Sequence, residues 1–316
     1  MNVSVIIVNY NTTDHLQKCL KAIFNFTTLI NFEVIVVDNN SPDRCIENLP
    51  NEFPKVRFFF RDVNDGFGAA CNFGVKNAKG KYFLFANPDI IIEQNSLKEI
   101  FNYMENNSNV ALSSGILFGD NGENVHTFNY FPDLGWEFME ASGKGTGKRI
   151  KQLLSNEKVV SKSSVALEVD WTMGAFMFVR AEVFKRINGF DEIFFLYYED
   201  VDLQKRIINL GYKIVVLPSV RIFHFERGSV RSFEGENIYF FHMHRSRIIY
   251  FYKHSNFFYR NTVRAMHIAG YFFRLITLPF RKKFKGKEKQ KLYQYILILK
   301  IYFSSKEKII HLTYLK

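Results

Sequence analysis

The chain has 316 residues, of which 47% are hydrophobic and 23% charged, as is usual for a globular protein. Its net charge of +11 is local, because residues 255–316, here called the basic tail, carry 14 Lys and Arg against 2 Asp and Glu. The rest is nearly neutral and has no DNA- or RNA-recognition motif, which argues against a nucleic-acid-binding protein. The three cysteines, Cys19, Cys45 and Cys71, have no paired spacing. This excludes a zinc motif or disulfide framework and fits a reducing, cytosolic setting.

The beginning of the sequence lacks the pattern of a signal peptide. Met1–Val3 leads straight into an apolar run without a basic region or a cleavage site. No uncharged apolar stretch reaches the length of a membrane span, since the longest candidate, 265–280, is interrupted by Arg274. We therefore expect neither a leader nor a membrane-spanning helix.

The first ninety residues alternate between short apolar runs and a helical pattern. Each run ends in polar turn residues, which is typical of buried strands. A strand, a helix and a second strand predict a right-handed βαβ unit in a parallel sheet. The predicted strands are 3–8, 33–37, 56–60 and a run from Tyr82 that ends near Asn87, and the helix after the first strand has an apolar face of Leu16, Cys19, Leu20, Ile23 and Phe24. Thr12 or Thr13 is suited to cap that helix.

Asp89 lies just after the fourth predicted strand. Pro88 has no backbone N–H to donate, so this strand has to end near Asn87. Asp89 is then on a tight turn at the carboxyl end of a central strand, where open α/β sheets bind ligands. A carboxylate there can hold a divalent cation, which in turn holds a diphosphate. The alternative is an aspartate that only caps the turn.

Two further motifs follow predicted strands. Asp38 ends the second strand, where it can accept hydrogen bonds from a base or ribose or form an Asx-turn with the residues after it. The segment Gly66–Gly74 begins like a dinucleotide-binding loop, but it has Cys71 where a third glycine belongs and follows the third strand instead of the first. Glycines that allow a tight turn into a helix explain it better than a pyrophosphate cradle does.

Beyond Val110 the pattern is less regular. Residues 141–164 are rich in Gly, Ser and Lys, which fits either a mobile loop beside the site or a linker. Regular patterns then predict a short helix from Ala181, a helix from Glu199 to Leu210 with Gly211 after its end, and strands over 213–217 and 220–224.

Glu199 and Asp200 begin one of these helices. Carboxylates are favoured at helix N-termini for electrostatic reasons alone. The functional alternative makes one of the pair a general base, whose pKa the helix start lowers and a neighbouring carboxylate raises. His224 ends the last strand; a lone histidine is more often structural than a metal ligand, and we expect His242, His244 and His254 to be structural.

Taken together and in order, these motifs closely resemble the family 2 glycosyltransferases of GT-A fold, and most of all their bacterial rhamnosyltransferase-like branch. The resemblance covers about residues 1–250. It implies an α/β fold with a Rossmann-like, mostly parallel sheet flanked by helices, to which the basic tail adds a helical extension. The segments that carry it are Val3–Asn11, Asp38–Ser41, Asn64–Gly74, Asn87–Asp89, Gly174–Phe176, Gly189–Glu192 and Glu199–Leu203.

The resemblance also implies roles for individual residues. The nucleotide site would consist of Val8, Asn9, Asp38 and Asn72, and the acceptor site of Trp171, Gly174 and Ala175. The base would be Asp200, with Glu199 beside it. The metal site would consist of Asp89 and His224. The cofactor would be Mg²⁺ or Mn²⁺. Many family members have Asp-x-Asp where this chain has Asn87-Pro88-Asp89, and the missing carboxylate weakens the expected affinity for the cation.

The implied activity is transfer of a sugar, rhamnose above others, with inversion, from a dTDP or UDP donor to a saccharide acceptor that is lipid-linked, in cell-surface polysaccharide synthesis. One alternative is another sugar, such as galactose, glucose or an N-acetylhexosamine, from a UDP donor. Another is an NAD-dependent dehydrogenase that uses the Gly66 loop. The predicted domains are a nucleotide-sugar-binding half over 1–110, an acceptor-binding half over 111–254, and the basic tail.

The basic tail mixes basic with large apolar residues. Segments 257–280 and 292–303 are rich in Phe, Tyr, Ile and Leu, and a run of lysines and one arginine lies between them. This pattern suits helices that lie in a membrane interface, where anionic lipids attract the basic residues. We expect a peripheral protein on the cytoplasmic face of the bacterial plasma membrane. The alternative is that the helices simply pack on the catalytic body.

Overall fold

The computed structural model describes residues 1–27, 29–42, 45–93, 95–119, 121–125, 127–143, 165–225, 233–281 and 284–312. Of the loop predicted over 141–164, residues 144–164 lie outside this part. The chain forms two compact units. The sheet unit consists of residues 1–131, 152–195 and 199–227, and the helical unit of residues 132–151, 196–198 and 228–316. The contacts thus group α9 (Phe233–His254) with the basic tail, whereas the sequence analysis placed it in the acceptor-binding half.

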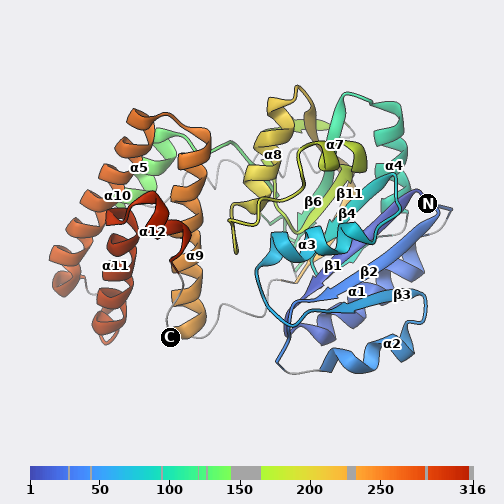
Figure 1. Ribbon diagram of the computed structural model, residues 1–316, viewed down its shortest axis with the longest axis horizontal. Helices are drawn as coiled ribbons and strands as arrows, with labels where there is room; N and C mark the ends of the chain where they lie inside the picture. The colour runs from blue at the N-terminus through green and yellow to red at the C-terminus, as the bar shows by residue number, and fades with distance from the viewer. Residues whose placement is uncertain are drawn as a thin grey trace. The chain divides into compact units, whose positions relative to one another are not determined.

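A mixed sheet is the centre of the sheet unit (Figure 1). Its strands are β1 (Val3–Asn9), β2 (Phe32–Asp38), β3 (Val56–Phe60), β4 (Tyr82–Ala86), β5 (Ile90–Ile92), β6 (Val110–Phe118), β8 (Leu167–Val169), β10 (Phe176–Arg180) and β11 (Lys213–His224). Their order is β3-β2-β1-β4-β10-β6-β11-β5, with β8 beside β11. The first four strands pair in parallel, and β10 is antiparallel to β4 and β6. A separate small sheet pairs β7 (Phe128–Asn129) with β9 (Trp171–Thr172).

Helices cover both faces of the sheet because strands that are buried on both sides need an apolar partner on each. One face packs against α1 (Thr13–Phe26), α2 (Leu49–Glu52) and α4 (Ser96–Asn106). The other packs against α3 (Phe67–Lys76), α7 (Ala181–Arg186) and α8 (Glu199–Asn209). A short 3₁₀ helix, Cys45–Asn48, precedes α2. The predicted apolar face of α1 is confirmed, since Leu16, Cys19, Leu20 and Ile23 are buried.

Two details differ from the sequence prediction. Thr12 is the N-cap of α1, but its side chain does not cap the helix; its hydroxyl donates to Asn9 Oδ1 at 2.9 Å instead. The strands predicted over 213–217 and 220–224 are one strand, β11, whose register against β6 shifts between Leu217 and Arg221. Pro218 lies in that irregular stretch, where no ladder donor is needed. The predicted end of β4 before Pro88 is confirmed.

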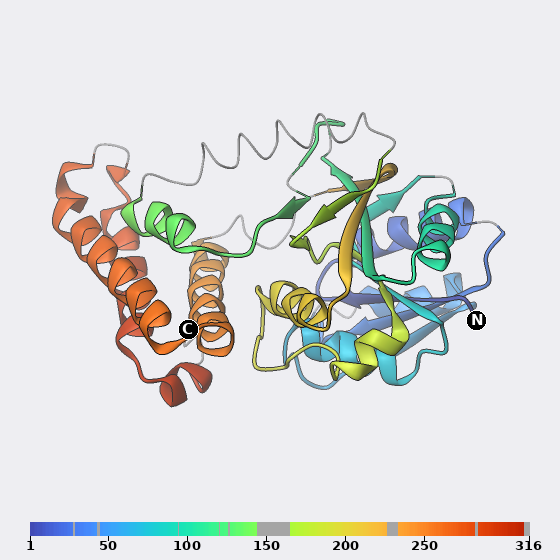
Figure 2. The same ribbon diagram turned by 90° about the horizontal axis from the view of Figure 1, so that it is seen from above.

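The helical unit contains α5 (Leu134–Ser142), α9, α10 (Phe257–Thr277), α11 (Glu288–Phe303) and α12 (Lys306–Ile310), with a 3₁₀ turn at Leu278–Phe280. Figure 2 shows α5 in green running beside the orange α10. The basic tail is therefore helical, as predicted. Within the described part of the chain, no helix has both the length and the apolarity needed to cross a bilayer.

Candidate active site

The carboxyl ends of β1 and β2 bring Asn9 and Asp38 side by side. The two residues pair in the parallel register, and Asn9 Nδ2 donates to Asp38 Oδ1 at 2.8 Å. Ser41 donates to the same carboxylate twice, from Oγ at 2.6 Å and from its backbone N at 2.9 Å. Asp38 thus forms the Asx-type turn that was one of its two predicted roles. Asp38 also lies at the carboxyl end of β2, the position that its other predicted role, hydrogen bonding to a base or ribose, requires.

The other two residues predicted at the nucleotide site, Val8 and Asn72, do not take part in these hydrogen bonds of Asp38 and each have their own contacts. Val8 is buried in the core beneath α3. The amide of Asn72 clamps Phe190, because Nδ2 donates to its carbonyl at 2.9 Å and Oδ1 accepts from its N–H at 3.0 Å. Gly189 has a φ of +68°, and a Cβ there would lie 2.5 Å from Asn72 Oδ1. The Asn72 amide therefore orders the turn that follows α7.

Asp89 and His224 come together from neighbouring strands. β5 pairs antiparallel with the end of β11, so that His224 pairs with Ile90, and Phe225 N donates to the carbonyl of Asp89 at 3.0 Å. His224 Nε2 lies 3.2 Å from Asp89 Oδ1. That oxygen is buried and has no hydrogen-bond partner of good geometry within the described residues. The structure therefore leaves a carboxylate oxygen and an imidazole nitrogen facing one another.

These two side chains fit a divalent cation only in part. Mg²⁺ is usually bound by one or two carboxylates together with substrate phosphates and water, rather than by a complete set of protein ligands. Among the described residues, no group of three or more His, Cys, Asp or Glu is placed to hold a metal. Asp89 and His224 thus suit a cation that arrives with a diphosphate.

The start of α8 holds two adjacent carboxylates, of which Glu199 is buried and Asp200 half-buried. Asp200 Oδ2 accepts from the backbone N of Gly174 at 2.9 Å, and Oδ1 accepts from that of Val201 at 2.8 Å. A Cβ on Gly174 would lie 3.2 Å from the carboxylate, so glycine permits this close approach. Glu199 is 7% exposed, and its Oε2 has no hydrogen-bond partner in the described part of the chain.

Burial raises the pKa of both carboxyl groups. For Asp200, desolvation outweighs the two backbone donors and raises the pKa to about 6. For Glu199, desolvation and the neighbouring Asp200 raise the pKa well above its usual value. A carboxylate with a pKa near 6 is a stronger base than an exposed aspartate and is still ionised at neutral pH.

The predicted acceptor residues connect these features. Ala175 accepts a hydrogen bond through its carbonyl from Asn87 N at 2.9 Å, which ties the end of β4 to the loop that carries Gly174. Trp171 is partly exposed, and its Nε1 donates to the carbonyl of Tyr130 at 2.9 Å. The structure therefore joins Gly174 and Ala175 to both the Asp89 turn and the start of α8.

Gln204 was not identified from the sequence. It lies one turn after Asp200 on α8 and is fully buried. Its Oε1 accepts from Thr172 N and its Nε2 donates to Thr172 O, both at 2.7 Å. This clamp fixes β9, the strand that contains Trp171, onto α8. The available signal was a glutamine on the apolar face of a predicted helix, where a buried amide needs partners.

Comparison with known proteins decides the family. The family model described as "Glycosyl transferase family 2" matches residues 4–164, and that described as "N-terminal domain of galactosyltransferase" matches residues 156–228. The chain belongs to glycosyl transferase family 2. It is accordingly a glycosyltransferase.

Relatives of known sequence support this assignment over most of the chain. The rhamnosyltransferase WbbL of Escherichia coli strain K12 is 30% identical over 240 residues, which are 73% of this chain and 86% of the relative. An N-acetylglucosaminyl-diphospho-decaprenol L-rhamnosyltransferase of Mycobacterium tuberculosis is 24% identical over 239 residues, 70% of this chain and 75% of the relative.

Solved structures establish the GT-A fold. The structure of S. aureus TarS 1–349 in complex with UDP superimposes with a TM-score of 0.53 at 17% identity, over 95% of this chain and 82% of that chain. GalNAc-T7 with UDP, GalNAc and Mn²⁺ superimposes with a TM-score of 0.56 at 15% identity, over 72% of this chain and 43% of that chain.

Proposed function

We propose that this glycosyltransferase moves rhamnose, with inversion, from a nucleoside-diphosphate donor to a lipid-linked saccharide in cell-surface polysaccharide synthesis. The observation that carries the chemistry is the half-buried Asp200 carboxylate, which accepts a hydrogen bond from Gly174 N at 2.9 Å and whose pKa desolvation raises to about 6. The choice of rhamnose is supported by the two rhamnosyltransferases among the relatives. The nucleotide is dTDP or UDP in this proposal.

The proposed reaction needs a base on one side of the sugar and charge neutralisation on the other. Asp200 takes the proton of the acceptor hydroxyl as that oxygen attacks the anomeric carbon, and the bond to the diphosphate breaks on the opposite face. Asn9, Asp38 and Asn72 border the nucleotide, and Trp171, Gly174 and Ala175 border the acceptor. Asp89 and His224 would hold Mg²⁺ or Mn²⁺, which neutralises charge on the leaving diphosphate.

We further propose that the helical unit associates with an anionic membrane surface. One side of α10 is exposed and carries no charged residue: Phe258, Thr262, Ala265, Ala269, Phe272 and Ile276 follow helical spacing. Phe258 is 80% exposed, Ile276 71%, and Phe280 just beyond them 84%. The ring of Phe272 meets that of Phe303 on α11 with centroids 6.1 Å apart. We call these seven α10 and turn residues together with Phe303 the apolar stripe.

The apolar stripe fits a lipid surface because basic residues accompany it. The basic tail has 14 Lys and Arg, and each one near an anionic leaflet contributes about 1 kcal/mol. Ile276→Glu with Phe280→Glu should abolish flotation with vesicles of phosphatidylglycerol at low salt. The matched control, Ile298→Val, changes a buried residue of the same unit and should float like the unaltered chain. Equal flotation of the double variant would contradict a membrane role for the stripe.

The sugar specificity is tested by donor binding followed by transfer. Thermal-shift measurements with dTDP-rhamnose, UDP-glucose, UDP-galactose and UDP-N-acetylhexosamines, each with and without Mn²⁺, identify the donor. We expect the largest stabilisation from dTDP-rhamnose with the cation. Transfer to N-acetylglucosaminyl-diphospho-decaprenol then tests the acceptor. Stabilisation by a UDP-sugar alone would favour the alternative, transfer of another sugar.

A further inference from the structure

The three residues before Glu199, Leu196–Tyr198, have an unusual backbone. Tyr197 and Tyr198 are consecutive residues with φ angles of 65° and 67°. This left-handed conformation is rare for bulky side chains and persists only where the surrounding structure holds it. Because Tyr198 is bonded directly to Glu199, its conformation determines how the chain enters α8.

Helix α9 supplies the groups that hold this three-residue segment. Ser246 Oγ donates to the carbonyl of Leu196 at 2.8 Å, and Arg247 Nε donates to the hydroxyl of Tyr198 at 3.0 Å. The ring of Tyr198 also packs against that of Tyr250, with centroids 5.5 Å apart. Both the segment and α9 belong to the helical unit.

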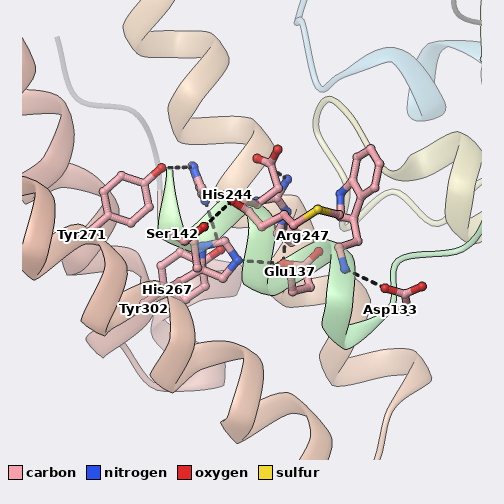
Figure 3. A network of polar contacts seen from close by, with 12 residues as sticks. Asp133, Glu137, Ser142, His244, Arg247, His267, Tyr271 and Tyr302 are labelled. Atoms are coloured by element: carbon pink, nitrogen blue, oxygen red, sulfur yellow. Dashed lines mark hydrogen bonds and ion pairs between the residues drawn. The ribbon is translucent and has the colours of Figure 1, made fainter. Parts of the chain in front are cut away.

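Arg247 also lies within a polar network of mostly buried side chains (Figure 3). Its Nε lies 3.8 Å from Glu137 Oε2, and its Nη2 lies 3.6 Å from Glu140 Oε2. The same Glu137 oxygen is 2.7 Å from Nε2 of His267, whose ring stacks on Tyr302 with centroids 4.7 Å apart. A buried guanidinium needs such acidic partners, and they limit the positions that it can adopt.

The residues on both flanks of the segment are anchored within the sheet unit. Before it, the carbonyl of Phe195 accepts from Phe67 N at 3.1 Å. After it, Glu199 starts α8, and Asp200 accepts from Gly174 N. Leu196–Tyr198 therefore connects two anchored positions: Phe195 before it, and the start of α8, with Asp200, after it.

We propose that Arg247 is a positioning residue for the base. By holding Tyr198 in the left-handed conformation, it fixes the entry into α8 and thereby the direction of the Asp200 carboxylate. This inference rests on the proposed role of Asp200. Arg247 acts through Tyr198 and does not touch the reacting atoms, so its loss should lower kcat and leave KM for the donor unchanged.

Two variants remove the same hydrogen bond from opposite sides. Tyr198→Phe deletes only the hydroxyl, and Arg247→Met deletes the donor. We expect each to lower kcat at least tenfold with KM for dTDP-rhamnose within twofold, and the double variant to lose little more than Arg247→Met alone. Arg264→Met is the matched control, because this arginine donates to the carbonyls of Tyr302 and Ser304 and not to the segment.

A backbone measurement gives a readout that needs no substrate. If the Asp200 carboxylate loses its direction, Gly174 N loses its acceptor, and hydrogen exchange of the peptide that contains Gly174 should accelerate in Tyr198→Phe and Arg247→Met but not in Arg264→Met. The pH midpoint of kcat should rise in the same two variants, since a lost donor raises a carboxylate's pKa.

The outcomes separate this inference from the proposed function. Asp200→Asn is measured in the same transfer assay. If it is inactive while Tyr198→Phe and Arg247→Met keep kcat and exchange within twofold of the unaltered chain, the positioning role is wrong and the base assignment stands. An equal loss of kcat in Arg264→Met would also overturn positioning, because it would indicate a general loss of the helical unit. An active Asp200→Asn overturns the base and the positioning role together.

Discussion

The carboxylates of Asp38, Asp89 and Glu199 in the sheet unit differ in how the protein satisfies them. Asp38 accepts three hydrogen bonds, one from Asn9 and two from Ser41. Glu199 Oε2 is buried without a hydrogen-bond partner among the described residues, and the buried Asp89 Oδ1 has only the poorly aligned contact with His224 Nε2 at 3.2 Å. Because an unsatisfied buried oxygen costs free energy, its retention points to a ligand or a proton that is absent from the folded chain alone.

The same difference separates a carboxylate that stabilises the fold from carboxylates that can take part in binding or catalysis. A satisfied carboxylate such as Asp38 orders the turn on which a nucleotide would rest. An unsatisfied one destabilises the fold by itself but is ready to bind a cation or to hold a proton. We therefore expect substitutions in the two groups to have opposite consequences.

The largest effect is expected for Asp200→Asn. An amide cannot accept the acceptor's proton, so kcat should fall by about 10³-fold or more, whereas donor affinity should stay within about twofold because the proton moves only in the transition state. Steady-state kinetics together with donor titration measures both. A rate within tenfold of the unaltered chain would shift the base to Glu199.

Asp89→Ala should have the next largest effect and should change binding as well as rate. The diphosphate is present in the ground state and the transition state, so we expect donor affinity and kcat/KM each to fall by about 10- to 100-fold, with loss of the response to Mn²⁺. His224→Ala should show a milder form of the same defect. Full activity of the unaltered chain in EDTA would contradict the cation's role.

The pH dependence of kcat should report the raised pKa of Asp200. The base must be ionised, so activity should rise as the pH increases through about 6 and level off above 7. Below the midpoint, each pH unit should cost about tenfold. A midpoint near pH 4, as for an exposed aspartate, would show that desolvation does not raise the pKa of Asp200.

Asp38→Ala should act mainly on stability. It removes one of two acceptors of the buried Asn9 amide, which keeps Ser41 Oγ at 3.2 Å, and leaves two Ser41 donors without their acceptor. We expect a loss of about 1–3 kcal/mol in the free energy of unfolding. Urea denaturation measures the loss. Ser41→Ala is the matched comparison: it removes the Oγ that donates to Asp38 and accepts from Asn9 Nδ2 and Asn11 N, but leaves the carboxylate in place. It should cost less, because the Asn9 amide and the Ser41 N–H keep Asp38 as their acceptor.

Glu199→Gln should act on stability in the opposite direction. The pKa of Glu199 is raised in the folded chain, so the unfolded chain releases a proton more readily and folding is disfavoured as the pH rises above the ordinary value of 4.5. The glutamine removes this penalty. We expect the Tm of Glu199→Gln to be higher than that of the unaltered chain at pH 7.5, and the difference between the two Tm values to disappear as the pH falls toward 4. A lower Tm at pH 7.5 would mean that Glu199 is satisfied in solution.

Much of the site could be predicted because each element ends at a local signal. Pro88 ended β4 and placed Asp89 at its carboxyl end, and a polar turn after β2 did the same for Asp38. The approach of His224 to Asp89 was suggested only by resemblance, since it depends on β5 pairing antiparallel with β11. Gln204 was missed, because its partners at Thr172 lie 32 residues away in the sequence.

The sequence by itself determined the first four long strands, the apolar helix faces, the basic tail and the order of motifs that identified the family. These depend on periodicity, turn residues and composition, which are local properties of the chain. Only the tertiary structure decided which carboxylates are satisfied, how strongly burial raises the pKa of Asp200, and that α9 holds the left-handed backbone before Glu199. Hydrogen bonding and desolvation depend on neighbours brought together by folding, and no local pattern encodes them.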